Sequence, residues 1–237
     1  METKLAVLID AENAQHSKIK IMLDELTTYG IPVIKRIYGD WTTPQLGGWK
    51  NILLEHAIVP VQQYRYTAGK NSTDSAMIID AMDILHRENV DGFCLVSSDS
   101  DFTRLATRLR ESGKLVIGMG EEKTPKPFVS ACNRFIYIEF LNKVSRSQKK
   151  TFQSIMTNAE LIDLLNQSID VLADDSGWAF LGDLGNLLLK KQPDFDSRCF
   201  GYQKLTLLIE AFDQLYELDK RTMENALGLQ IFVKRKS

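Results

Sequence analysis

The chain has 237 residues, of which 44% are hydrophobic and 25% are charged, and its formal net charge is −2. We expect two domains at this length. No apolar run approaches the roughly 20 residues of a membrane-spanning helix, which argues against a membrane protein. The sequence shows neither a basic leader nor a pattern of paired cysteines, which argues against a secreted protein. We therefore expect a cytoplasmic protein that inserts in no membrane.

Strand-like apolar runs alternate with helical stretches over the first 140 residues. The runs are nearly continuous in Val, Ile and Leu, as is typical of parallel strands covered by helices on both faces. Apolar residues recur every three to four positions over 75–88, which predicts a helix with Thr73 as its N-cap. The predicted strands cover residues 5–9, 33–38, 58–64, 93–96, 115–119 and 135–138. We predict an α/β fold, a Rossmann-like three-layer α/β/α domain with a parallel central sheet.

Acidic residues stand where two of these strands end. Asp10 follows the first strand and Asp99 follows the fourth, so both should face the crevice beyond the carboxyl ends of the sheet. Asp74 joins them from a helix N-terminus, Asp101 acts directly or through water, and Asn13 adds a neutral oxygen. Hard oxygen ligands of this kind suit Mg²⁺ or Mn²⁺. The sequence predicts a site for either ion.

A structural explanation competes with the metal site. Asp is a favoured helix N-cap, and any one of these residues taken alone is more often a cap than a ligand. Four carboxylates at one edge, however, repel one another without a cation, and this favours metal. Asp80 lies six residues after Asp74 and points about 120° away on an ideal helix. A supporting role and a solvated face both stay open for Asp80.

The order of these residues resembles the NYN domain, a PIN-like nuclease family, over roughly residues 3–140. The motifs are Ile9-Asp10-x-x-Asn13, Lys70-x-x-x-Asp74 with Asp80 behind it, and Ser97-Ser98-Asp99-Ser100-Asp101-Phe102. The resemblance implies metal-dependent cleavage of RNA, with metal or catalytic roles for Asp10, Asn13, Asp74, Asp99 and Asp101. It also implies an active-site role for Asp80. The chain departs from the family pattern at Ser100, often Gly, and at residues 71–73, often containing Gly and Val.

Cations and one aromatic residue near this site are candidates for contact with a nucleic acid. Lys70, four residues before Asp74, and Arg104 are expected to guide phosphate toward the acidic cleft, and Arg36 is a further candidate. Trp41 follows a strand end, where it either stacks on a base or staples the next helix to the sheet.

A second region begins after a change in composition. Residues 141–157 are expected to form a basic linker between a first domain at 1–140 and a second at 158–237. In the second domain, helical stretches and a turn at Gly177-Trp178 precede β-prone pieces at 215–218 and 229–233. This order describes a winged helix-turn-helix.

The second region resembles the LOTUS domain, also called OST-HTH, over about residues 155–235. Its motifs are Gly177-Trp178-Ala179-Phe180-Leu181, Leu184-Gly185 and Phe195-Asp196-x-Arg198-x-Phe200-Gly201-Tyr202-x-Lys204-Leu205. The family implies a winged helix that binds RNA or a protein partner. Arg198, Tyr202 and Lys204 flank a helix start and are our candidates for RNA contact. The alternative is that the aromatic residues are core and that Arg198 pairs with Asp196.

The sequence thus leads to one main hypothesis, a two-domain metal-dependent endoribonuclease that hydrolyses RNA phosphodiesters. Two alternatives stay open. One is a non-catalytic RNA-binding adaptor that retains the nuclease fold, and the other is a structure-specific DNA nuclease. The sequence predicts no oligomeric state.

Overall fold

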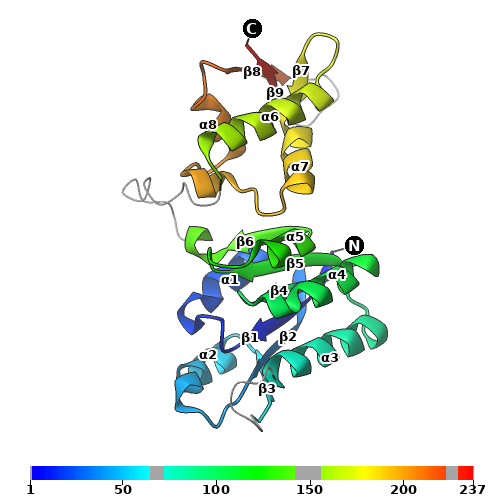
Figure 1. Cartoon of the computed structure of the whole chain (residues 1–237), viewed down its shortest axis with the longest axis vertical. Coiled ribbons are helices and arrows are strands. Elements are labelled where there is room, and N and C mark those ends of the chain that lie inside the picture. Colours follow the sequence, from blue (N-terminus) through cyan, green and yellow to red (C-terminus); the bar gives the residue numbers. More distant parts are fainter. Residues whose placement is uncertain (1, 65–71, 142–155, 223–228, 237) are drawn as a thin grey trace. The chain divides into compact units, whose positions relative to one another are not determined.

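The computed structural model describes residues 2–64, 72–141, 156–222 and 229–236. The chain divides into two compact units, Met1–Asn142 and Lys143–Ser237 (Figure 1). Most of the expected basic linker, from residue 142 to residue 155, lies outside the described residues. None of the helices within the described ranges combines the length and the apolar character that a bilayer crossing requires.

A six-stranded parallel sheet forms the centre of the first unit, with the strand order β3-β2-β1-β4-β5-β6. Its strands are β1 (Lys4–Asp10), β2 (Ile31–Gly39), β3 (Val59–Gln62), β4 (Gly92–Val96), β5 (Leu115–Gly120) and β6 (Arg134–Tyr137). This sheet confirms the predicted α/β class. Chain order reverses between β1 and β4, and in open parallel sheets ligands bind beyond the strand ends at such a point.

Helices cover both faces of this sheet (Figure 1). They are α1 (Ile19–Leu26), α2 (Lys50–Glu55), α3 (Ser72–Arg87), α4 (Thr103–Glu111) and α5 (Lys126–Ala131), with short 3₁₀ turns at His16–Lys18, Pro44–Trp49, Ser100–Phe102 and Ile138–Leu141. Alternate residues of β1, Val7 and Ile9 among them, pack with Ile19 and Met22 of α1. Each such buried side chain stabilises the fold by about 1.5–3 kcal/mol.

The start of α3 differs from the prediction. Thr73 was expected as the N-cap, but the helix already includes Ser72, so that cap assignment is wrong. Thr73 is buried in the first turn, and its hydroxyl donates to Glu12 Oε1 at 3.3 Å. The Thr73 hydroxyl therefore donates to a carboxylate from the loop after β1. Sequence reasoning had expected it to accept a backbone N–H of the helix.

The second unit packs helices against a three-stranded antiparallel sheet of order β7-β9-β8. Its elements are α6 (Asn158–Leu172), β7 (Trp178–Phe180), α7 (Leu181–Lys191), a 3₁₀ turn (Ser197–Phe200), α8 (Leu205–Glu210), β8 (Tyr216–Thr222) and β9 (Leu229–Arg235). Thr157 and Glu160 form a reciprocal capping box at the start of α6. Helices followed by a β8–β9 hairpin confirm the predicted winged helix-turn-helix.

One strand of the second unit was missed. Trp178 was assigned to a turn with Gly177, yet it begins β7, whose residues pair with Phe232, Val233 and Lys234 of β9. Gly177 does turn, with φ of +83°. Three residues are too few for a period-two pattern, and their pairing partner lies more than fifty residues away. Local sequence could not show this strand.

Candidate active site

The expected acidic residues come together at the carboxyl edge of the parallel sheet. Asp10 is the last residue of β1, and Ile9 before it pairs with Val96, the last residue of β4. The loop that follows β4 therefore runs beside Asp10. Asp99 lies in this loop, so two neighbouring strand ends each deliver a carboxylate to one place.

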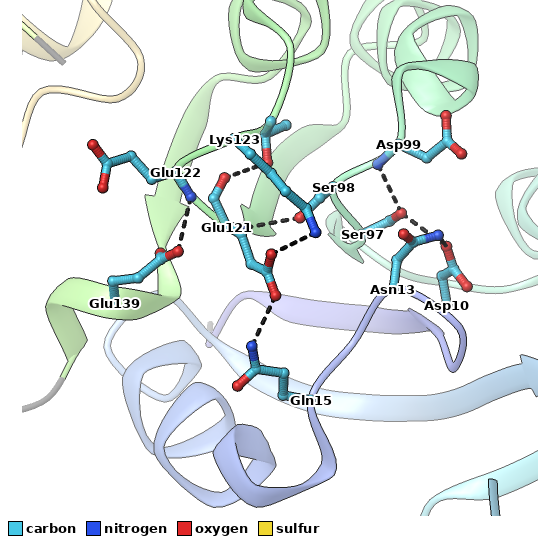
Figure 2. A network of polar contacts seen from close by, with 11 residues as sticks. Asp10, Asn13, Gln15, Ser97, Ser98, Asp99, Glu121, Glu122, Lys123 and Glu139 are labelled. Carbon is cyan, nitrogen blue, oxygen red and sulfur yellow. Dashed lines mark hydrogen bonds and ion pairs between the residues drawn. The ribbon is translucent and has the colours of Figure 1, made fainter. Parts of the chain in front are cut away.

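Asp10 is buried, with 1% of its surface exposed, and its carboxylate is held by three donors. The backbone N–H of Glu12 donates to Oδ1 at 3.0 Å. Asn13 Nδ2 and Ser97 Oγ donate to Oδ2 at 2.7 and 2.9 Å (Figure 2). Burial raises the pKa of Asp10, and the hydrogen bonds from Asn13 and Ser97 oppose that rise. Asn13 thus contacts Asp10 through its amide nitrogen.

Ser97 links the two strand ends and was not among the predicted site residues. Its hydroxyl donates to Asp10 and accepts the backbone N–H of Asp99 at 3.1 Å (Figure 2). A Cβ at Gly120, on the neighbouring β5, would lie 2.6 Å from the carbonyl oxygen of Ser97. The loop that carries Asp99 is thus fixed from β1 on one side and packed closely against β5 on the other.

Three carboxylates form a compact group in this edge. Oxygen atoms of Asp74, Asp99 and Asp101 all lie within 4.8 Å of one another, and Asp10 is not part of that group. Asp74 comes from the first turn of α3. Asp99 caps the 3₁₀ turn after β4 by accepting the N–H of Asp101 at 2.9 Å. The helix-cap explanation therefore holds for Asp99, and its carboxylate still lies within the acidic group.

The electrostatics of the group fit a divalent cation. Burial, together with the negative charges of Asp10, Asp99, Asp101 and Glu12, raises the pKa of Asp74 to about 6. Converging carboxylate oxygens are the ligands that Mg²⁺ and Mn²⁺ take, and a cation among them would relieve this repulsion. The donor set therefore fits the predicted ions, with Asp74, Asp99 and Asp101 as the residues that could hold one.

Asp80 lies away from this group, on the face of α3 that contacts β2. Both Arg36 Nη1 and the hydroxyl of Tyr38 donate to its carboxylate. The hydrogen bond that Arg36 donates to Asp80 raises the pKa of Arg36. Arg36, considered above as a guide for phosphate, is thus paired with Asp80.

The other candidates near the site have separate outcomes. Arg104 is exposed in the first turn of α4, and Lys70 lies outside the described residues. The indole N–H of Trp41 donates to the carbonyl of Val61 at 3.0 Å, and its ring packs against the core. These contacts match the staple explanation for Trp41.

Carboxylates also follow β5 and β2, the strands on either side of the β1–β4 pair. Glu121 follows β5, where it accepts Gln15 Nε2 at 2.8 Å and pairs with Lys123 at 2.7 Å (Figure 2). The hydrogen bond from Lys123 lowers the pKa of Glu121. Asp40, which follows β2, is buried and accepts Gln62 Nε2 at 2.9 Å. Sequence reasoning missed both, although each stands two residues after a predicted strand, close to the place that Asp10 has after the first one.

In the second unit, the predicted RNA contacts differ in availability. Arg198 forms a two-pronged pair with Asp196, with nitrogen–oxygen distances of 2.7 to 3.1 Å. Tyr202 packs against the hydrophobic core, and Lys204 is exposed at the N-cap of α8. Of the two cations, Lys204 is exposed to solvent, whereas Arg198 is paired with Asp196.

Two known domain families match consecutive parts of the chain. The NYN domain matches residues 4–139, and the OST-HTH/LOTUS domain matches residues 156–226. An uncharacterized protein of Methanocaldococcus jannaschii is 29% identical over 125 residues, which are 51% of this chain and 49% of that protein. The chain thus spans about half the length of this curated relative.

Two solved structures are similar to parts of the chain. A crystal structure of a protein of unknown function from Vibrio parahaemolyticus has 20% identity and a TM-score of 0.49, covering 58% of this chain and 93% of that one. A solution NMR structure of an uncharacterized protein from Nitrosomonas europaea has 36% identity and a TM-score of 0.29, covering 32% of this chain and 71% of that one.

Proposed function

Because this chain belongs to the NYN domain family and continues into an OST-HTH/LOTUS domain, we propose that it is a metal-dependent endoribonuclease whose second domain binds the RNA. The two domains support a nuclease or RNA-binding role. The observation that carries the finer proposal is the convergence of the Asp74, Asp99 and Asp101 carboxylates within 4.8 Å at the carboxyl edge of the sheet.

Each residue of the site has a separate task in this proposal. Asp74, Asp99 and Asp101 hold Mg²⁺ or Mn²⁺, which when bound supplies Lewis-acid activation of water and of the phosphodiester. Asp10 lies outside the group of three and organises the loop after β4 through Ser97. The negative charge of Asp10 acts on Asp74, and it adds to the negative potential of the group, which favours cation binding.

In the second domain, RNA binding is proposed to use the exposed cation of Lys204 at the start of α8. Backbone N–H groups at a helix start and a nearby cation both attract phosphate. Arg198 is expected to attract phosphate less strongly, because its guanidinium is paired with Asp196.

The direct test is cleavage of a labelled circular single-stranded RNA by the full chain, since only an endonuclease opens a circle. Activity should require Mg²⁺ or Mn²⁺, stop in EDTA and be lost in Asp99→Asn. Asp24→Asn is the matched control, because Asp24 is exposed on α1 and its carboxylate pairs with Lys20 of the same helix.

The outcomes separate the three functional hypotheses. Cleavage that persists in EDTA and in Asp99→Asn would overturn the metal-dependent mechanism. RNA binding without cleavage at any Mg²⁺ or Mn²⁺ concentration would support the adaptor. Faster cleavage of a matched circular DNA would support the DNA nuclease.

A further inference from the structure

Asp74 reaches the acidic group in a different way from its two neighbours. Asp99 and Asp101 follow β4 within five residues and are fixed by that strand and by their own turn. Asp74 belongs to helix α3, so its position depends on how that helix is attached to the sheet. A misplacement of about 1 Å at a functional site is enough to impair it.

The attachment is a polar contact between α3 and β2. Asp80 lies in the middle of α3 and receives hydrogen bonds from Arg36 on one carboxylate oxygen and from Tyr38 on the other. The side chains of Arg36 and Asp80 are 33% and 21% exposed, and Tyr38 is fully buried. Because the pair is largely shielded from water, loss of one partner leaves the others without the bonds that offset their desolvation.

The register of the sheet shows why this contact affects the site. Arg36 and Tyr38 are two residues apart on β2 and therefore point to the same face. Tyr38 pairs with Asp10 across the β1–β2 ladder. Asp80 is thus tied to the strand position that lies beside Asp10, while Asp74 lies six residues, or about 1.7 turns, earlier on the same helix.

We propose that Asp80 is a positioning residue, which fixes α3 on β2 through Arg36 and Tyr38 and so holds Asp74 against Asp99 and Asp101. This inference rests on the proposed metal site. Its mechanical part, the attachment of the helix, does not depend on catalysis and can be measured in metal-free protein.

The test compares Asp80→Asn with Asp83→Asn in the full chain. Both remove one carboxylate charge from α3, but Asp83 is exposed and forms its ion pair with Arg87 on the same helix, at 3.7 Å. Hydrogen exchange in the N-terminal half of α3 is measured without metal, and Mn²⁺ affinity is measured by calorimetry. Asp80→Asn should speed exchange there and weaken Mn²⁺ binding about tenfold, as loss of a supporting partner typically does. Asp83→Asn should change neither.

A milder variant and a double-mutant cycle complete the design. Tyr38→Phe removes one donor without changing charge, so it should give a smaller shift in the same direction if Asp80→Asn folds poorly. In an Asp74→Asn background, Asp80→Asn should lose its effect on Mn²⁺ affinity, because the ligand that it positions is gone.

Effects that simply add would show that Asp80 acts on metal binding by another route, and equal exchange in Asp80→Asn and Asp83→Asn would overturn the proposal. Failure of the unaltered protein to bind Mn²⁺ would overturn the proposed function, while the exchange comparison would still decide the attachment of α3.

Discussion

The hydroxyl of Ser97 donates to Asp10 across 2.9 Å and accepts the backbone N–H of Asp99, so one side chain joins two adjacent strand ends. Ser97 is 1% exposed, and water cannot readily replace it. The geometry of the acidic edge therefore depends on a residue that carries no charge.

Replacement of Ser97 by Ala should destabilise the metal-free protein by about 1–3 kcal/mol, because it leaves the Asp99 N–H and one Asp10 oxygen short of a partner. RNA cleavage should fall by about tenfold or more, the usual cost of a lost supporting contact. Denaturant unfolding and single-turnover cleavage measure the two effects. Ser112→Ala is the control, since the Ser112 hydroxyl donates to a carbonyl of its own helix. Similar losses in both variants would argue against the bridge.

Asp74→Asn should make the metal-free protein more stable and the enzyme inactive. The substitution removes a carboxylate that burial and four neighbouring acids disfavour. A gain of about 1 kcal/mol corresponds to a rise in Tm of roughly 2–4 °C for a domain of this size. Cleavage should drop by more than about 100-fold, because a ligand costs more than a supporting partner. A lower Tm without metal would contradict the repulsion on which the site is argued.

The pH dependence of the metal-free protein should show the same residue. The pKa of Asp74 is raised from 3.8 to about 6 in the folded chain, so the folded state holds this proton more tightly than the unfolded state. The contribution of Asp74 to the free energy of unfolding is therefore full below about pH 4 and is lost as the pH rises through 6. Its size is on the order of 1 kcal/mol after allowance for solvent screening of a half-buried group.

Urea unfolding of metal-stripped protein between pH 4 and 7 measures this loss. The raised pKa of Asp10 contributes with the same sign, so the difference between the unaltered chain and Asp74→Asn isolates the part that belongs to Asp74. A difference that does not vary with pH would show that Asp74 titrates near its ordinary value.

In the second domain, Lys204→Met should weaken RNA binding and lower the slope of log affinity against log salt by about 0.7, the value for one phosphate contact on a single strand. Arg198→Met should change the slope less, because Asp196 already neutralises the guanidinium. Fluorescence anisotropy with a labelled RNA at several salt concentrations measures both slopes. A larger change at Arg198 than at Lys204 would mean that the Asp196 pair opens when RNA binds.

Strand positions and the acidic edge could be predicted because both follow from local patterns. Continuous apolar runs indicated six parallel strands, and parallel strands bring their carboxyl ends to one edge. Asp10 and Asp99 could therefore be placed together from the sequence. Asp74 joined them on the argument that a helix begins at the same edge, and its carboxylate lies in the group as expected.

What could not be predicted depends on contacts between distant segments. Thr73 was assigned to a cap because Glu12, its acceptor, is 61 residues away. The partners of Asp80 lie on β2, and a helical wheel cannot tell a solvated face from one that meets Arg36 and Tyr38. Ser97 stood within a quoted motif, but its role appears only when β1 and β4 are neighbours.

The absent side chain at Gly120 limits how this protein could be altered. Any larger residue there would push on the Ser97 carbonyl, only 2.6 Å from the nearest added atom, and would displace the loop bearing Asp99. A library aimed at new substrates should therefore leave position 120 untouched and vary α4 or the rim of the crevice instead. The geometry of the acidic edge thus depends on a residue that contributes no functional group.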